Sequence, residues 1–320
     1  MTVIAVAGGT GGVGRAIVDA LNGTGKFEVV ILSRKACSTS KEKEKELGSR
    51  IITVDYENIP GLAEVLEENK IGTVISTLEM MTGHGPEEAL IRAADKSTIT
   101  KRYIPSIWGV PYSEETIKDF PAAKWKIECL ELLKASSLEY TAIYNGLFLD
   151  YFVVPVVPTH LSLLAIFLDV TNNAAAIPGT GNNTIVFTHT WDVARFVAAY
   201  VEKAKWVPEA YILGDKATLD ELLKITEDAK GVKFTVSYDS LEDLAAGRVT
   251  ELPSHLHAYP FVPKPALQGV LATLGLMVAK DMFNLEPEWT LNQEFPDIKP
   301  RTIKQLINEA WGTGQTSTRS

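Results

Sequence analysis

The chain has 320 residues, of which 46% are hydrophobic and 22% charged, and its formal net charge is −9. This composition is ordinary for a globular protein with one large domain or two closely joined ones. An acidic balance argues against nucleic acid as a partner, because phosphate contacts need clustered lysines and arginines. Cys37 and Cys129 are too few for a disulfide framework, and the chain begins without a signal peptide, so we expect a cytoplasmic protein.

The first half of the chain alternates apolar runs with segments of helical spacing. Apolar runs predict six strands, at residues 3–7, 27–32, 51–54, 73–77, 101–105 and 140–144. Helical spacing predicts helices at residues 15–21, 59–68, 86–95 and 122–135. Strands and helices that alternate at this pitch indicate an α/β fold with a doubly wound parallel sheet.

After Asn145 this alternation breaks. Residues 143–168 are the most apolar stretch, but they include Asn145, Asp150 and two prolines, so they fit a core or pocket better than a membrane span. Beyond it we expect a strand at 184–188, a helix at 191–202, a further strand of the sheet at 211–213, and mostly helix from 219 to 311. A smaller, mostly helical lobe should cover the carboxyl ends of the strands, where open parallel sheets bind ligands.

We therefore expect residues 1–155 and 182–215 to form one domain, residues 156–181 and 216–311 a second lobe, and residues 312–320 a disordered tail. The first domain would bind a cofactor, as the next motif indicates, and the lobe would bind the substrate.

A glycine-rich loop, residues 8–14 (GGTGGVG), follows the first predicted strand and opens a helix. Its glycines match the G-x-G-x-x-G pattern, in which the backbone passes close to a pyrophosphate and a helix N-terminus faces the phosphates. Strand, loop and helix occur in the required order, so we predict a dinucleotide-binding Rossmann fold. The predicted contacts are Gly8, Thr10, Gly11, Gly12, Val13 and Gly14.

The end of the second strand discriminates between the two nicotinamide cofactors. NAD-binding domains carry an acid there, whereas this chain has Ser33, Arg34 and Lys35. Because an arginine fork binds a 2′-phosphate that an acid would repel, we predict NADP(H). Further predicted cofactor contacts follow later strands: Asp55, Ser76, Thr77 and Asn145.

The usual proton donor of reductases with such a sheet is missing. None of the ten tyrosines is followed by lysine four positions later, so no Tyr-x-x-x-Lys pair exists. Lys126, early in the helix before the sixth strand, can instead hydrogen-bond the nicotinamide ribose, donate a proton or polarise a carbonyl. On residue type alone, a solvated helix lysine is the more common alternative, so both readings of Lys126 stay open at this point.

These motifs resemble the NmrA-like and isoflavone reductase-like family, atypical relatives of the short-chain dehydrogenases/reductases. The resemblance rests on the glycine loop, on residues 33–35, and on Lys126 followed fourteen residues later by Tyr140 and Thr141. Residues 145–152 (NGLFLDYF) are similar to fungal members, and residues 190–194 (TWDVA) resemble a later helix start of the family. The resemblance covers most of the first 200 residues and implies that Lys126 matches the catalytic or ribose-binding lysine of the plant reductases.

One departure concerns the segment after the fifth strand. Plant reductases carry Ser-Glu-Phe-Gly there, and this chain has Ser-Ile-Trp-Gly at residues 106–109. The pocket floor therefore differs, and no flavonoid or lignan substrate is inferred.

A set of aromatic residues and histidines near the predicted ligand-binding edge is expected to line the substrate pocket. Aromatic walls with a few polar groups suit a flat or polycyclic ligand. The predicted residues are His84, Trp108, Tyr112, Tyr144, Phe148, Tyr151, Phe152 and His189. The remaining histidines lack metal-ligand spacing, so no metal site is predicted.

The combined prediction is an NADP(H)-dependent oxidoreductase of secondary metabolism. It would transfer hydride to or from a C=N, C=C or C=O bond of a hydrophobic aromatic or alkaloid-like metabolite. Two alternatives stay open: a redox-coupled cyclase of fungal secondary metabolism, and a non-catalytic NmrA-like regulator that senses NADP. The expected partners are a small hydrophobic substrate, with no nucleic acid and no membrane, and the chain would be a monomer or a homodimer.

Overall fold

The computed structural model describes residues 2–34, 41–80, 83–118, 120–162 and 164–312. Lys35, Cys37 and the predicted tail beyond Gly312 lie outside these described residues. The chain forms two compact units. The first comprises Met1–Tyr144, Trp191–Ile212 and Trp289–Ile298, and the second comprises Asn145–Thr190, Leu213–Glu288 and Lys299–Ser320.

The first unit is built on a six-stranded sheet in the order β3-β2-β1-β4-β5-β6, with every neighbouring pair parallel. Its strands are β1 (Thr2–Ala7), β2 (Phe27–Arg34), β3 (Arg50–Val54), β4 (Ile71–Ser76), β5 (Arg102–Ile104) and β6 (Glu139–Tyr140). The order reverses between β1 and β4, which is the Rossmann arrangement. The predicted doubly wound α/β fold is confirmed.

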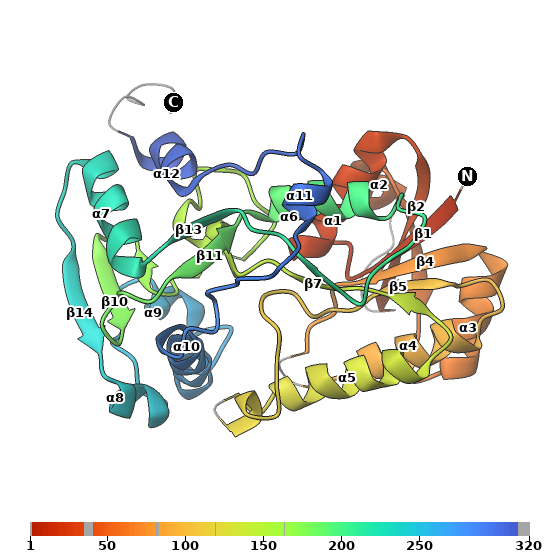
Figure 1. Ribbon diagram of the computed structural model, residues 1–320, viewed down its shortest axis with the longest axis horizontal. Helices are drawn as coiled ribbons and strands as arrows, with labels where there is room; N and C mark the ends of the chain where they lie inside the picture. Colours follow the sequence, from red (N-terminus) through yellow and green to blue (C-terminus); the bar gives the residue numbers. More distant parts are fainter. Residues whose placement is uncertain (1, 35–40, 81–82, 119, 163, 313–320) are drawn as a thin grey trace. The chain divides into compact units, whose positions relative to one another are not determined.

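Helices cover both faces of this sheet. They are α1 (Gly12–Thr24), α2 (Lys41–Leu47), α3 (Ile59–Glu68), α4 (Gly85–Lys96), η1 (Thr116–Lys118), α5 (Ala123–Ala135), α6 (Thr190–Tyr200) and α11 (Leu291–Glu294). Figure 1 shows α1 and α6 on one face and α3, α4 and α5 on the other. Leu62, Leu90 and Leu133 of the latter helices are nearly inaccessible and pack on the sheet residues Val74 and Tyr103. The apolar runs of the central strands β1, β2 and β4 are thus buried from both sides.

The predicted sixth strand, residues 140–144, is divided at Thr141. Glu139 and Tyr140 pair with β5, whereas β7 (Ala142–Tyr144) pairs with β12 (Glu209–Tyr211) in a separate two-stranded sheet. The Thr141 hydroxyl hydrogen-bonds the Val207 carbonyl at 2.6 Å and the Tyr200 hydroxyl at 3.0 Å. The prediction of one continuous strand is therefore wrong, because two different neighbours pair with the two halves of this run. The strand expected at 211–213 shares only Tyr211 with β12 (Glu209–Tyr211), and β12 lies outside the main sheet, so this prediction is also wrong.

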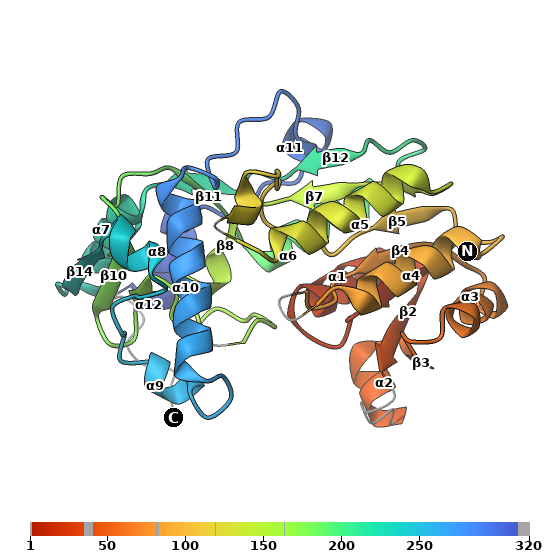
Figure 2. The same ribbon diagram turned by 90° about the horizontal axis from the view of Figure 1, so that it is seen from below.

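The second unit contains two three-stranded sheets and several helices. One sheet has the order β14 (Thr235–Asp239), β10 (Ala174–Pro178), β9 (Leu168–Asp169), and the other the order β13 (Asp215–Ala217), β11 (Ile185–Thr188), β8 (Leu147–Phe148). The helices are η2 (Leu149–Phe152), α7 (Leu219–Lys230), α8 (Leu241–Ala245), α9 (His255–Ala258), α10 (Lys264–Ala279) and α12 (Ile303–Trp311). In Figure 2 the long α10 runs beside α8 and β10, against which it packs.

The expected helical content from residue 219 onward is observed in α7 to α10 and α12, but this range also contains β14, which the sequence analysis did not predict. Of the strands in this unit it identified only β11, and it did not predict η2. Across the described ranges, no helix is both long and apolar enough to traverse a membrane.

Candidate functional site

The glycine loop is held in a tight turn between β1 and α1. Gly8 has a φ of +81°, a conformation that side chains other than glycine's rarely adopt. A Cβ on Gly14 would overlap the Gly8 carbonyl oxygen and the Thr77 hydroxyl, and Thr77 in turn donates to the Ala7 carbonyl at 2.8 Å. The loop is therefore packed against the end of β4 with no room for larger residues.

The outer side of the same loop is open. A Cβ on Gly11 would meet no atom within 4 Å, and α1 begins at the next residue, Gly12. The N–H groups in the first turn of a helix have no acceptor within the helix and point outward. An anion can approach this turn without obstruction, with Thr10 half-buried beside it and the Val13 side chain buried.

At the end of β2, Ser33 is buried and Arg34 is exposed. Among the described residues, Arg34 makes no hydrogen bond or ion pair, so its guanidinium is available to an anionic ligand. The Arg34 charge lies near the Tyr56 hydroxyl, which is buried and has no hydrogen-bond partner in the described part of the chain. Asp55, which follows β3, is exposed and accepts a hydrogen bond from the Glu57 N–H at 3.0 Å.

Lys126 lies in the first turn of α5, next to the segment that follows β5. Its ammonium donates to the Ser106 carbonyl at 3.1 Å and lies 5.6 Å from the centre of the Tyr112 ring. Burial lowers the pKa of Lys126 to about 8, and the carboxylates of Glu87 and Glu79 oppose this shift. A lysine with this pKa exists in both protonation states near neutral pH and can give or take a proton.

The residues at the carboxyl ends of β4 and β5 form one hydrogen-bonded group around Glu87. This side chain is 1% exposed and accepts bonds from the Ser76 hydroxyl, from the Tyr103 hydroxyl at 3.2 Å and from the Ser106 N–H at 3.1 Å. The Trp108 indole N–H donates to the Ser76 carbonyl at 3.2 Å. Because the strands are parallel, the glycine loop and these residues share the carboxyl edge of the sheet.

His84 lies at the N-cap of α4 and bridges two helices. Its Nε2 is 3.5 Å from a Glu88 carboxylate oxygen and 3.3 Å from one of Glu128, and its ring stacks on Trp125. These contacts join α4 to α5.

Tyr112, whose ring lies beside the Lys126 ammonium, and Tyr144 belong to the first unit. Both line a small cavity of about 120 Å³, and Tyr144 packs against Tyr211 with ring centres 5.1 Å apart. Neither lies among the residues around the larger pocket described next.

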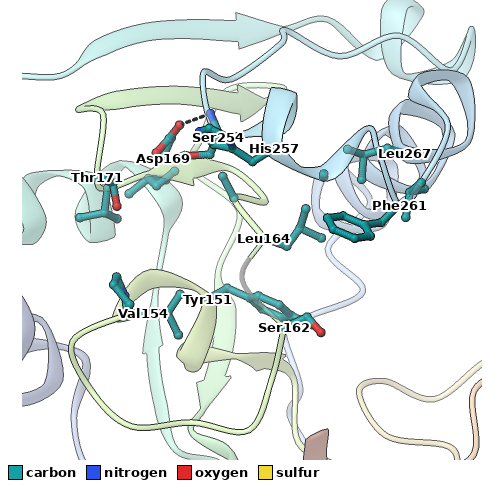
Figure 3. Close-up of a pocket in the computed structure, with 16 residues that line it drawn as sticks. Tyr151, Val154, Ser162, Leu164, Asp169, Thr171, Ser254, His257, Phe261 and Leu267 are labelled. Carbon is teal, nitrogen blue, oxygen red and sulfur yellow. Dashed lines mark hydrogen bonds between the residues drawn. The ribbon is translucent and has the colours of Figure 1, made fainter.

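The second unit contains a pocket of about 780 Å³ (Figure 3). Two chain segments line it: Tyr151, Val154, Pro155, Ser162, Leu164, Ala165, Leu168, Asp169, Val170 and Thr171 from the first, and Ser254, His257, Ala258, Phe261, Val262 and Leu267 from the second. Most of these side chains are apolar, and Phe261 is 86% exposed. Burial raises the pKa of Tyr151 to about 12, so its hydroxyl is a neutral hydrogen-bond donor at the pocket wall.

Asp169 is the carboxylate of this pocket, and its oxygens are already occupied. They accept hydrogen bonds from the Asn172 N–H and side-chain amide at 3.0–3.2 Å and from the Ser254 N–H at 2.7 Å. Figure 3 shows the bond to Ser254 at one end of the pocket. The pocket has no lysine or arginine among its described lining residues.

Of the other predicted pocket residues in this unit, Phe152 is buried in the core against Phe187 with ring centres 5.7 Å apart, and Phe148 is half-buried. His189 is inaccessible: its Nε2 lies 3.5 Å from Asp150 and its Nδ1 3.1 Å from the Arg301 guanidinium. Tyr151 alone among the four lines the pocket.

Asn145, a predicted cofactor contact, is fully buried at the end of β7. Its carbonyl accepts a hydrogen bond from the Thr188 hydroxyl at 2.7 Å.

Two features of these sites were missed by sequence reasoning. Glu87 and Glu88 are adjacent in an acidic helix start, and nothing in the sequence shows which of them is buried. The lining from Ser254 to Leu267 lies about a hundred residues from Tyr151 and carries no motif; the proline breaks there were the only signal.

The sequence is similar to a protein-family model and to fungal proteins of known class. The NmrA-like family model matches residues 1–258. The chain is 36% identical to Oxidoreductase BOA1 of Botryotinia fuckeliana over 73% of this chain and 78% of that protein. It is 28% identical to Oxidoreductase swnN of Metarhizium robertsii over 99% of both.

Among solved structures, the complex of leucoanthocyanidin reductase with NADPH from Vitis vinifera matches with a TM-score of 0.72. The identity is 19%, over 96% of this chain and 99% of that one, so the match shows a shared fold. The family model extends well beyond half of the chain, which confirms the resemblance inferred from the motifs. The chain therefore belongs to the NmrA-like family, and the two fungal relatives compared above are oxidoreductases.

Proposed function

We propose that this protein is an NADP(H)-dependent oxidoreductase. It would transfer hydride to or from a C=N, C=C or C=O bond of a hydrophobic aromatic or alkaloid-like small molecule. The observation that carries the proposal is the position of Lys126: a lysine with a lowered pKa lies at the same sheet edge as an open, glycine-lined helix start. The oxidoreductases among the relatives support the reaction class.

The first unit fits NADP(H) at two separate points. The open space over Gly11 beside the start of α1 accommodates a pyrophosphate, which the first-turn N–H groups would bind. Exposed Arg34 would bind the 2′-phosphate in a bidentate manner. The NADPH complex of leucoanthocyanidin reductase, which has the same fold, supports this assignment.

In the proposed mechanism the cofactor would supply or accept the hydride, and a side chain of the protein would donate or accept the proton. Lys126 would donate a proton to the substrate atom that gains negative charge in reduction, and would take it back in oxidation. The Ser106 carbonyl orients its ammonium, and the Trp108 side chain is held at the same sheet edge by its bond to the Ser76 carbonyl.

The pocket of the second unit would bind the apolar body of the substrate. Its volume suits a polycyclic molecule, and the Tyr151 hydroxyl offers one donor to a carbonyl or ether oxygen.

A turnover screen tests the proposed function. The protein is incubated with NADPH and uncharged aromatic ketones, enones and imines, and both cofactor consumption and products are measured. We expect a reduced product that carries deuterium from labelled NADPH. A cyclised product without net NADPH consumption would instead identify a redox-coupled cyclase, and tight binding of NADP⁺ and NADPH without turnover would identify a sensor.

Two glycine substitutions separate packing from cofactor binding in the loop. Gly14→Ala should destabilise the cofactor-free fold by about 1–3 kcal/mol, because its Cβ overlaps the Gly8 carbonyl. Gly11→Ala should leave the thermal stability nearly unchanged, since its Cβ meets nothing, yet it should weaken NADPH binding by placing a methyl where the pyrophosphate lies. Melting curves and NADPH titrations of both variants check this. Unchanged affinity in Gly11→Ala would show that the pyrophosphate lies elsewhere.

A bulky residue in the pocket should affect the substrate alone. Ala258→Trp fills space at the pocket wall, so the substrate KM should rise by about tenfold or more. The NADPH affinity should stay the same, because none of the proposed cofactor residues lines this pocket. Leu256→Trp, two positions earlier and 60% exposed outside the lining, is the matched control. An equal response of both variants in steady-state kinetics would refute the pocket assignment.

A further inference from the structure

Glu87 is a fully buried carboxylate that the mechanism above does not use. It lies in the first turn of α4, and only 1% of its surface is exposed. Its neighbour Glu88 reaches solvent and pairs with Arg92 at 2.8 Å. Burying an ionisable group is costly unless hydrogen bonds and an opposite charge compensate for it, so the surroundings of Glu87 indicate what it does.

Three donors from different elements converge on this carboxylate. The Ser76 hydroxyl comes from the end of β4, the Tyr103 hydroxyl from β5, and the Ser106 N–H from the segment that follows β5. The other side of the Ser106 residue faces Lys126, whose ammonium donates to the Ser106 carbonyl at 3.1 Å. Glu87 and Lys126 are therefore linked through the backbone of a single residue.

We propose that Glu87 is a positioning residue for Lys126. Its carboxylate fixes the Ser106 backbone through the N–H, and the Ser106 carbonyl then holds the Lys126 ammonium in place. The negative charge of Glu87 also stabilises the protonated form of the Lys126 amine. The catalytic role of Lys126 rests on the proposed function. The hydrogen bonds that join Glu87, Ser106 and Lys126 are independent of it.

Burial raises the pKa of Glu87 above its usual value. The bonds from Ser76, Ser106 and Tyr103 and the Lys126 charge offset only part of this rise. The groups that act on Lys126 are Glu87 from α4, Glu79 after β4 and Cys129 on its own helix. Glu87 makes the largest of these contributions, so loss of its charge should lower the pKa of Lys126 further.

The variant Glu87→Gln separates charge from shape. A glutamine has the same size, and its amide oxygen can still accept the Ser106 and Tyr103 bonds while its amino group donates to Ser76. Glu88→Gln, one position later and half-buried on the same helix, is the matched control, because Glu88 pairs with Arg92 and makes no hydrogen bond to Ser106.

The test measures the pKa of Lys126 in the cofactor-free protein. Acetic anhydride labels amines in their neutral form, and mass spectrometry of the Lys126 peptide gives the extent of labelling at each pH. We expect the midpoint of labelling to fall by about one pH unit in Glu87→Gln and to stay at the wild-type value in Glu88→Gln. With substrate and NADPH, the pH profile of kcat should shift in the same direction, with little change in KM.

Tyr103→Phe provides an independent variant if Glu87→Gln does not fold. It retains the ring and removes one donor, so the carboxylate should protonate more readily and the labelling midpoint of Lys126 should fall by a smaller amount. A wild-type midpoint in every folded variant would overturn the proposal. Because the labelling needs neither cofactor nor turnover, it also distinguishes this failure from failure of the proposed oxidoreductase activity.

Discussion

Replacing Lys126 with alanine is expected to lower kcat by roughly 10²- to 10⁴-fold, the usual contribution of a general acid. The sequence has no Tyr-x-x-x-Lys pair to replace it, and the ammonium is already oriented by the Ser106 carbonyl. In the wild type, the rate of reduction should fall as the pH rises through about 8, because the ammonium form that donates the proton is lost there. The reverse reaction needs the neutral amine, so its rate should rise over the same range.

Steady-state kinetics of reduction and of oxidation, measured from about pH 6 to pH 10, check this prediction. This range extends about two pH units on each side of the pKa of Lys126 and therefore covers both of its protonation states. Lys124→Ala is the matched control, because Lys124 is two positions earlier, is exposed and pairs only loosely with Glu128 at 3.6 Å. A Lys126→Ala enzyme with wild-type kcat and an unchanged pH profile would show that another group handles the proton.

Arg34→Ala is expected to weaken NADPH binding by about tenfold to a hundredfold, which corresponds to the loss of one strong charge-assisted contact. Binding of NADH, which lacks the 2′-phosphate, should change little. The reason is that Arg34 is exposed at the discriminating end of β2 and has no partner of its own among the described residues. Fluorescence titrations with both reduced cofactors give the ratio of dissociation constants directly.

Arg50→Ala controls for the loss of a surface cation. Arg50 begins the neighbouring strand β3, is also exposed, and pairs with Glu28 at 2.9 Å. Equal losses for NADPH and NADH in Arg34→Ala would mean that Arg34 does not recognise the 2′-phosphate.

The centre of the first unit's sheet was predictable because β1, β2 and β4 are short apolar runs that are almost entirely buried. The runs at β1, β2 and β4 are bounded by glycines or polar residues, and the structure confirms them within two residues at each end. The split at Thr141 was not predictable, since it depends on the neighbours that β6 and β7 acquire in three dimensions. In the second unit, β10 reads AAAIP, a composition with no strand signal, so its sheet escaped detection.

The parts of the candidate site that depend on residue type and sequence position alone could be predicted from the sequence. The glycine loop and Arg34 are read from residue type and position, and their geometry is suited to those roles. Burial is a different matter, because it arises from tertiary packing. For this reason the sequence did not distinguish Glu87 from Glu88, and did not show that His189 is inaccessible or that residues 254–267 line a pocket.

Calorimetric titration of the wild-type protein with NADPH, NADP⁺ and NADH tests the central claim, a site for NADP(H) in the first unit, most directly. The open loop over Gly11 and the exposed guanidinium of Arg34 predict saturable binding of NADPH and NADP⁺ with one site per chain, and binding of NADH that is weaker by at least about tenfold. Equal affinity for NADH would contradict the role of Arg34, and no binding of any of the three would contradict the cofactor site itself.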